Sequence, residues 1–190
     1  MKNIGDKEDR DKELIGKIVE GDEVAFEEIV KKYERRVWNT IYRYIGESDE
    51  VEDVAQEVFI KVWRHAKSFK GKSKFSTWLY RIVVNQCLNY RGRHKEKPAS
   101  LDEIMEHGRT PDSLKVEIGD EEKPKIVRRA IDELPERQRI ALVLSRFEGK
   151  SYREIAQIMG VSLSSVESLI FRARAILKKK LLPLRKKGEI

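Results

Sequence analysis

The chain has 190 residues, a formal net charge of +7 and 38% charged residues, which allows one domain or two small helical ones and favours a polyanionic partner. A single cysteine, Cys87, excludes an internal disulfide, and no apolar run approaches the roughly 20 residues that span a membrane. The N-terminal residues lack the apolar segment of a signal peptide, so we expect a cytoplasmic protein without membrane insertion.

The sign of the charge alternates along the chain. Residues 1–57 carry a net charge of −7 and residues 96–124 a net charge of −5. By contrast, residues 58–95 hold ten basic residues and no acid, and residues 125–190 carry a net charge of +9. Two basic blocks separated by an acidic one predict two nucleic-acid contacts joined by a spacer.

Apolar residues three and four positions apart predict long helices in the first half of the chain. The first helix starts its apolar stripe at Val24 and ends at Gly46. The second is capped by Ser48 or Asp49, has acids in its first turn and runs to about residue 69. Its predicted core stripe consists of Val51, Val54, Ala55, Val58 and Val62.

A third helix is predicted to begin with Ser76 as its cap and to stop near Gly92. The periodicity then fails in an acidic stretch that holds three prolines and two glycines. Such a composition favours a linker, with one short helical turn near residues 101–106, although an inserted structural element is an alternative. Helical periodicity resumes at Pro124, and we find neither a strand pattern nor an internal repeat.

The predicted fold class is therefore all-α. Two small helical domains, residues 1–94 and 125–190, are joined by a flexible acidic linker, residues 95–124. The C-terminal domain is expected to contain a helix-turn-helix.

The helix-turn-helix pattern lies in "SYREIAQIMGVSLSSVESLIFRARA". Ser151 and Glu154 have the spacing of a capping box. Gly160 stands where the turn needs a positive φ, and Ser162 can cap the second helix. The residues expected to face inward are Ile155, Ala156, Met159, Val161, Val166, Leu169, Ile170 and Ala173. In such motifs the second helix lies in the major groove of DNA.

The outward positions of this second helix are candidates for contacts with duplex DNA. Eight Lys and Arg residues without an acid follow between residues 168 and 188, which suits phosphate contact. The candidate DNA-binding residues are Ser162, Ser164, Ser165, Glu167, Ser168, Arg172 and Arg174. An ordinary helical hairpin with a solvated basic end is the simpler alternative.

With these motifs in hand, the chain resembles a bacterial sigma factor of the extracytoplasmic-function type over about residues 20–95 and 124–182. "DVAQEVFIKVW" resembles the helix that docks on the clamp coiled coil of RNA polymerase. "FSTWLYRIVVN" resembles the reader of the −10 promoter element, and "LPERQRIALVLSRFEGKSYREIAQIMGVSLSSVESLIFRAR" resembles the reader of the −35 element.

The resemblance implies two helical domains, sigma regions 2 and 4. It implies an alternative sigma factor that binds core RNA polymerase and directs promoter recognition, −10 melting and transcription initiation. A membrane-linked or soluble anti-sigma factor is an expected further partner.

A second face of the predicted 51–63 helix lies beside its core stripe. It consists of Asp53, Gln56, Glu57 and Ile60, at positions i, i+3, i+4 and i+7. The resemblance implies that this face docks on core polymerase. A merely solvated face is the alternative.

The acid-free stretch from residue 70 to 95 mixes lysines, aromatics and amides, which suits binding of a single DNA strand. The candidate −10 contacts are Lys70, Lys72, Lys74, Trp78, Arg81, Asn85 and Asn89. Asn85 offers a donor and an acceptor, and the resemblance implies that it lines the pocket of a flipped −10 base. Trp78 can instead pack in the core.

One position departs from the family pattern. Family members commonly carry a basic residue where Glu167 stands and often another at Leu169. Glu167 cannot bind phosphate, but it can accept a hydrogen bond from the N4 amino group of cytosine. The −35 sequence preference is therefore left open.

No catalytic centre is expected. His65, His94 and His107 are scattered, and the chain shows no Cys/His metal-ligand spacing and no glycine-rich phosphate loop. The sequence thus predicts no catalytic residue, no metal and no cofactor. Two further readings stay open: a stand-alone helix-turn-helix regulator of duplex DNA, and an adaptor that binds only proteins.

Overall fold

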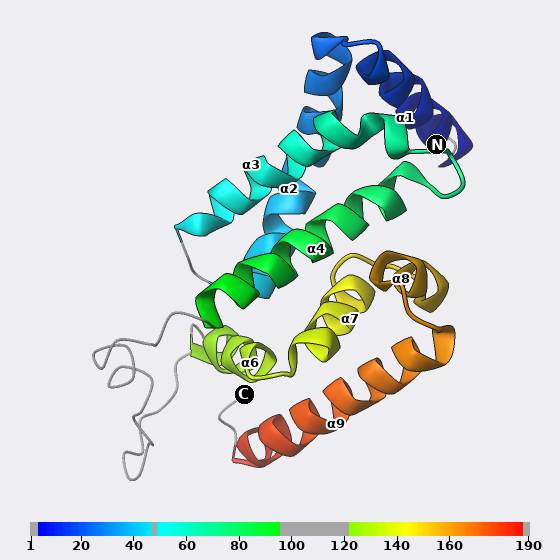
Figure 1. Cartoon of the computed structure of the whole chain (residues 1–190). Helices are drawn as coiled ribbons and strands as arrows, with labels where there is room; N and C mark the ends of the chain where they lie inside the picture. The colour runs from blue at the N-terminus through cyan, green and yellow to red at the C-terminus, as the bar shows by residue number, and fades with distance from the viewer. Residues whose placement is uncertain (1–3, 47–48, 96–121, 188–190) are drawn as a thin grey trace.

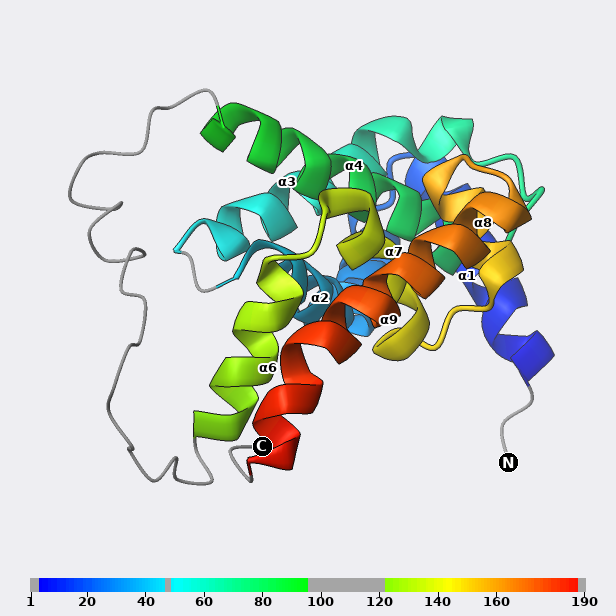
Figure 2. The same ribbon diagram turned by 90° about the horizontal axis from the view of Figure 1, so that it is seen from below.

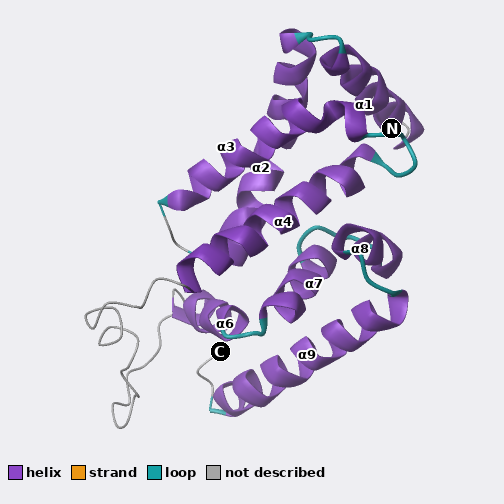
Figure 3. Cartoon of the chain, in the orientation of Figure 1, coloured by secondary structure: helices purple, strands orange, loops and turns teal. Residues whose placement is uncertain are grey.

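The computed structural model describes residues 4–46, 49–95 and 122–187. These residues form helices joined by short loops, without a strand (Figures 1 and 3). The N-terminal half contains α1 (Ile4–Val19), α2 (Glu23–Ile45), α3 (Glu50–His65), the short 3₁₀ helix η1 (Ala66–Ser68) and α4 (Phe75–Lys95). The C-terminal half contains α6 (Glu122–Asp132), α7 (Glu136–Arg146), α8 (Tyr152–Met159) and α9 (Leu163–Lys186).

The all-α prediction is confirmed, and several local predictions can be checked. The stripe from Val51 to Val62 is buried as expected. Only the start of the α2 stripe was placed one residue early, because Val24 is 75% exposed while Ala25 is buried. The Ser48 cap and the 101–106 turn lie outside the described residues.

Three predicted helix boundaries need correction or comment. Asp49 does occupy the N-cap position of α3, but its side chain makes no capping hydrogen bond. Ser76 is not the cap of α4, because the helix already begins at Phe75. The same helix passes through Gly92 and continues to Lys95, since a single glycine lowers helix stability without breaking it.

The N-terminal α1 was not anticipated as an element. Its buried residues Leu14, Ile15 and Ile18 join the core of the N-terminal half. Asp11 is also buried, and its carboxylate accepts hydrogen bonds from Lys32 Nζ at 2.5 Å and from the Tyr33 hydroxyl at 2.6 Å. Burial raises the pKa of Tyr33, and this hydrogen bond acts in the same direction. Both partners lie on α2, so Asp11 fastens α1 to α2.

The caps and the turn of the predicted helix-turn-helix are confirmed, although Ile158, which was not among the predicted inward residues, is buried and Met159 is only half-buried. The Ser151 side chain accepts from the Glu154 backbone, and the Glu154 carboxylate accepts from the Ser151 backbone at 2.9 Å. Gly160 has φ +64°, in the left-handed region, and lets the chain turn between α8 and α9. The Ser162 hydroxyl accepts from the Ser165 backbone at 3.1 Å and caps α9.

The two halves pack against one another, with α8 on α4 and α7 on α2 (Figure 2). Buried residues of the C-terminal half, including Ile140, Leu144 and Ile155, belong to the same apolar cluster as the N-terminal core. A smaller cluster, Ile131, Leu134, Leu142 and Ala173, lies within the C-terminal half. Among the described residues, no single helix could cross a membrane by length and apolarity, although the bent pair of α8 and α9 jointly could.

Candidate polymerase and nucleic-acid interfaces

The predicted docking face on α3 is only partly solvent-exposed. Asp53 and Gln56 are exposed, and Ile60 is 47% exposed, which is high for a large apolar side chain. Glu57 differs, because it is half-buried and accepts a hydrogen bond from the buried Gln86 Nε2 at 2.5 Å. Glu57 therefore helps to join α3 to α4, in addition to bordering the docking face.

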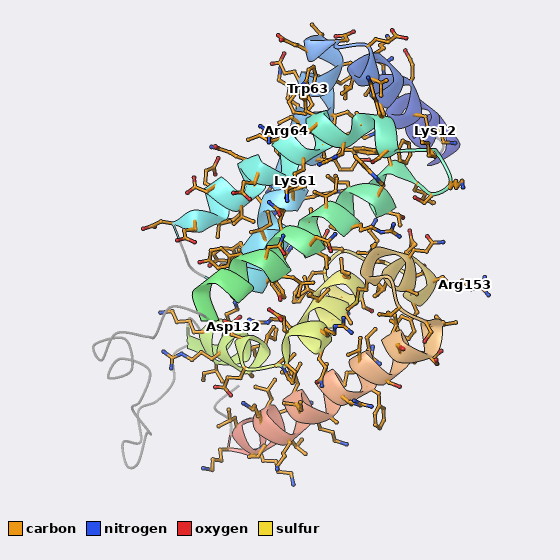
Figure 4. All side chains as sticks on the ribbon, viewed as in Figure 1. Lys12, Lys61, Trp63, Arg64, Asp132 and Arg153 are labelled. Carbon is orange, nitrogen blue, oxygen red and sulfur yellow. The ribbon has the colours of Figure 1, made fainter. Side chains whose placement is uncertain are left out.

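The Glu57 contact extends to a third side chain. Lys61 Nζ donates to Gln86 Oε1 at 2.6 Å, so both ends of the buried amide are bonded from α3. Buried amides need such partners, because an unsatisfied one costs about 1–3 kcal/mol. Lys61 and its neighbours Trp63 and Arg64 on α3 are labelled in Figure 4.

A groove of about 350 Å³ lies beside Gln56, between α2 and α3. Trp38 is 38% exposed there and stacks on Tyr42, with ring centroids 5.1 Å apart. Sequence patterns did not single out this groove, because the exposure of Trp38 depends on how α3 packs against α2. A partly exposed tryptophan next to a polar face is typical of protein-binding surfaces.

The predicted −10 surface begins in the loop before α4. Lys70, Lys72 and Lys74 are all exposed, and Gly71, with φ +66°, allows the tight turn between them. Trp78 is half-buried and packs against the rings of Phe69 and Phe75, with centroids 5.7 and 5.8 Å away. Of the two roles considered for Trp78, these ring contacts favour core packing.

The outward face of α4 carries Arg81, Asn85 and Asn89, all exposed. Asn85 is followed one turn later by Asn89, whose amide makes a long contact of 3.5 Å with Gln86 Oε1. Arg81 reaches across to the other half, where its Nη2 donates to the backbone carbonyl of Gln157 at 2.6 Å. One member of the predicted −10 set is therefore engaged by α8.

The predicted −35 surface lies at the start of α9. Ser162, Ser164, Glu167, Ser168, Arg172 and Arg174 are exposed, and Ser165 is half-buried. Part of the serine set is used locally, because Ser162 Oγ lies 3.0 Å from Ser164 Oγ and 2.8 Å from Ser165 Oγ. Phe171 is 75% exposed on the same helix. It lay outside the predicted set because an aromatic residue is usually assigned to the core.

Two electrostatic features mark the boundary between the halves. Burial raises the pKa of Tyr80, and its hydrogen bond to Glu148 acts in the same direction. Burial also lowers the pKa of Lys150, because desolvation disfavours the charged form. Among the described residues, no group of three or more His, Cys, Asp or Glu side chains is arranged to hold a metal ion.

Comparison with known proteins identifies both halves. A family model described as Sigma-70 region 2 matches residues 29–97, and one described as Sigma-70, region 4 matches residues 125–177. The chain is 40% identical over 186 residues to the ECF RNA polymerase sigma-E factor of Escherichia coli, which covers 92% of this chain and 95% of that protein. The chain belongs to the extracytoplasmic-function sigma factor family.

Other relatives agree with this assignment. The sigma-E factor of Haemophilus influenzae is 38% identical over 183 residues, covering 92% of this chain and 96% of that protein. The RNA polymerase sigma-H factor of Pseudomonas aeruginosa is 36% identical over 186 residues, covering 93% and 96%. As an extracytoplasmic-function sigma factor, the protein is an alternative sigma factor that acts in transcription initiation.

Solved structures share the fold. CnrH in complex with the cytosolic domain of CnrY matches with a TM-score of 0.66 and 25% identity, over 90% of this chain and 97% of that one. The sigma factor RpoE of Bartonella quintana, in complex with the anti-sigma factor NepR, matches with a TM-score of 0.61 and 23% identity, over 82% and 96%. The family and fold predicted from the sequence motifs are thus both confirmed.

Proposed function

We propose that this sigma factor divides its work between three surfaces. The exposed part of the α3 face, Asp53, Gln56 and Ile60, docks on core RNA polymerase together with the groove at Trp38. The lysine loop and the outward face of α4 bind the single-stranded −10 element. The start of α9 binds the −35 duplex. Residues 1–94 and 125–190 then act as regions 2 and 4.

The observation that carries this assignment is the arrangement of exposed residues on and before α4. Three lysines lead to a helix face that presents an arginine and two asparagines, while the aromatic side chains beneath are packed inward. Lysines follow phosphates and amides pair with base edges, so the surface suits a strand whose bases are splayed out. A flipped base costs a few kcal/mol of unstacking, which favourable edge contacts offset.

The assignment of Glu167 differs from that of the arginines on α9. Arg172 and Arg174 are exposed and suit backbone phosphates of the −35 duplex. Glu167 is also exposed but carries the opposite charge, so it suits a cytosine amino group and opposes phosphates.

The partners beyond DNA follow from the same assignment. The protein acts in the cytoplasm, uses no cofactor and catalyses no reaction of its own. An anti-sigma factor is a further partner, supported by the fold shared with a sigma factor solved in complex with one. The −10 surface on α4 is available to such an inhibitor only in part, because α4 and α8 contact each other.

The test is run-off transcription with bacterial core polymerase and a promoter selected from random −35 and −10 sequences. The wild-type chain is expected to direct initiation at a selected promoter, and core polymerase alone is not. Asp53→Lys with Gln56→Ala should abolish co-purification with core polymerase while the chain stays folded, because both side chains are exposed. Glu57 is left intact because reversing its charge would remove the acceptor of the Gln86 Nε2 hydrogen bond.

The matched control is Glu27→Lys. Glu27 is exposed on α2 and pairs with Lys31 of the same helix at 2.7 Å, and its substitution changes the net charge by the same amount. The control should assemble holoenzyme normally. Normal assembly by the Asp53/Gln56 variant would instead assign this face to solvent. Tight, sequence-specific footprinting by the free chain would favour a stand-alone regulator.

A further inference from the structure

A groove of about 540 Å³ lies between α1 and the segment that joins α3 to α4, and we call it the α1 groove. Its floor is apolar. Ile15 of α1 and Ala66 of η1 are buried, Phe69 is half-buried, and Val19, at the end of α1, is 39% exposed. Helix α1 packs beside η1, where the chain turns from α3 towards α4 (Figure 1). The apolar floor is therefore open to solvent at the edge of the N-terminal half.

Lysines surround this floor. Lys12 of α1, Lys67 of η1 and Lys70 of the following loop line the groove, and all three are exposed. Lys12, labelled in Figure 4, lies on α1 near the loop that leads into α4. Glu20 is the one acid among the lining residues. Three cations against one acid give the groove a positive potential, which favours an anionic ligand.

The lining residues carry few hydrogen-bonding side chains besides these charges. No amide or hydroxyl side chain is among them, so the groove lacks the groups that best read base edges. Apolar and aromatic surface beside phosphate-binding lysines is the arrangement that holds single-stranded nucleic acid with little sequence preference. The groove therefore suits a nucleotide that is held by its phosphate and by the face of its base.

The α1 groove is continuous with the predicted −10 surface. Lys70 and Gly71 belong both to the groove and to the lysine loop that leads to Lys72 and Lys74. A strand bound along that loop would reach the groove without leaving the protein surface. Helix α1 itself lies outside residues 29–97, the range that the region 2 family model matches. The groove thus adds a surface built on α1 to the one built on α4.

We propose that the α1 groove binds the one or two nucleotides of the single strand that directly adjoin the −10 element. Lys12 and Lys67 bind their phosphates, and a base packs on the apolar floor beside Phe69. The contact lengthens the bound strand and depends on charge and shape rather than on sequence. The inference rests on the proposed function of the lysine loop and α4 as the −10 surface.

The experiment uses holoenzyme assembled from core polymerase and the full-length chain. Fluorescence anisotropy measures its affinity for three single-stranded oligonucleotides: the selected −10 sequence alone, and the same sequence extended by three nucleotides at its 5′ or its 3′ end. We expect one of the two extensions to raise the affinity of the wild type. Polymerase contacts with the extension are the same in every variant, so a change in this gain reports on the sigma chain.

Lys12→Gln with Lys67→Gln should reduce the gain about three- to tenfold and lower its salt slope by about 0.7 for each lysine, the value for a phosphate of a single strand. Affinity for the unextended strand should stay at the wild-type level, because neither residue belongs to the lysine loop. The matched control is Lys17→Gln with Lys31→Gln. Both lysines are exposed, each in an ion pair within its own helix, and neither lines the groove. The control removes the same charge and should keep the gain.

Gly16 allows a test that changes no charge. It lies on α1 and lines the groove, and a Cβ added there would meet no atom within 4 Å. Gly16→Leu should fill part of the groove and lower the gain, whereas the control Gly16→Ala should keep it. Both replacements raise helix propensity, so neither should lose its fold, which a far-UV thermal melt checks.

A wild-type gain in both the Lys12/Lys67 variant and Gly16→Leu would overturn the proposal. Equal loss of the gain in the lysine control would overturn it as well, because the effect would then be one of net charge. A wild type that gains nothing from either extension leads to the same conclusion. If the groove variants instead lose co-purification with core polymerase, the groove binds an acidic protein surface and the proposal is wrong.

Failure of the proposed function is seen on the unextended strand. Wild-type holoenzyme that binds this strand no better than a scrambled −10 sequence contradicts the −10 assignment of α4, whatever the extensions show. Preference for the −10 sequence without a gain that depends on the groove contradicts only the inference about α1.

Discussion

The two helices assigned to promoter reading, α4 and α9, are exposed in different ways. Helix α4 packs against α2 and α3 within its own half and against α8 of the other, so only a narrow face with Arg81, Asn85 and Asn89 remains exposed. The start of α9 has no such cover, and Glu167, Ser168 and Arg172 are all exposed. The −10 reader is thus built into the core, whereas the −35 reader projects from it.

This difference follows from the packing of the two halves. Arg81 of α4 donates to the backbone carbonyl of Gln157 in α8, and Arg43 of α2 lies beside Glu148 of the C-terminal half.

The largest expected effect comes from the core that the halves share. Ile155 is fully buried in α8 and belongs to the cluster that includes the N-terminal core. Ile155→Ala should destabilise the chain by about 2–5 kcal/mol, because it removes buried methyl groups and leaves a cavity. All three tryptophans, Trp38, Trp63 and Trp78, lie in the N-terminal half, so their fluorescence reports on that half alone during urea unfolding.

If the halves unfold together, the tryptophan transition of Ile155→Ala shifts by as much as the transition seen by far-UV circular dichroism. Leu142→Ala is the control, because Leu142 belongs to the cluster within the C-terminal half. A tryptophan transition that stays at its wild-type midpoint in Ile155→Ala would show that the shared cluster contributes no coupling.

The next effect concerns the uncovered part of α4. Asn85→Ala should impair promoter opening by holoenzyme and cost roughly 1–3 kcal/mol of discrimination against −10 substitutions, the worth of one good amide–base pair. Polymerase docking should be unchanged, because Asn85 is exposed and lies on α4 rather than on the α3 face. Permanganate reactivity of −10 thymines measures opening, and co-purification measures docking separately. Normal opening with intact discrimination would move the base pocket to the loop of residues 70–76.

Much of this arrangement could be predicted from the sequence. Capping residues and φ-specific glycines act locally, so Ser151, Gly160 and Ser162 were placed correctly. The exposure of the Asn85 face follows from the periodicity of one helix. These are short-range signals, and each depends on a few neighbouring residues.

Contacts between distant segments could not be predicted in this way. Glu57 looked like a surface acid, but its bond to Gln86 depends on the packing of α3 on α4. Glu148 gave no signal at all, because its partners Arg43 and Tyr80 are 105 and 68 residues away. The groove at Trp38 could not be predicted either, because it forms where α3 packs against α2.

A smaller effect on DNA binding is expected to distinguish Arg172 on α9 from Arg81 on α4. Arg172→Ala should weaken binding of the free chain to duplex DNA almost equally for all sequences and lower the salt slope by about one. Arg81→Ala should leave free-chain binding nearly unchanged, because Arg81 is held by the Gln157 carbonyl, and should lower the salt slope in holoenzyme. Fluorescence anisotropy at several salt concentrations measures both. If Arg81→Ala changed the salt slope of DNA binding equally in the free chain and in holoenzyme, Arg81 would not be withheld from DNA by its contact with α8.

The smallest effect concerns the cap of α8, the helix that covers α4. Burial acts to raise the pKa of Glu154, but hydrogen bonds from the Ser151 backbone and hydroxyl outweigh it, and the pKa is lowered below 4.5. A lowered pKa in the folded state adds stability that is present above the unfolded pKa and is lost as pH falls through the folded pKa. Ser151→Ala should cost about 1 kcal/mol at neutral pH.

The pH dependence of the cap is measured by urea unfolding between pH 7 and pH 3. The stability difference between wild type and Glu154→Gln should shrink as the pH falls below about 4.5, because the carboxylate becomes protonated. Glu167→Gln, which removes the same charge from the exposed face of α9, is the matched control. A constant difference for Glu154→Gln across this range would mean that the carboxylate charge contributes nothing to the cap.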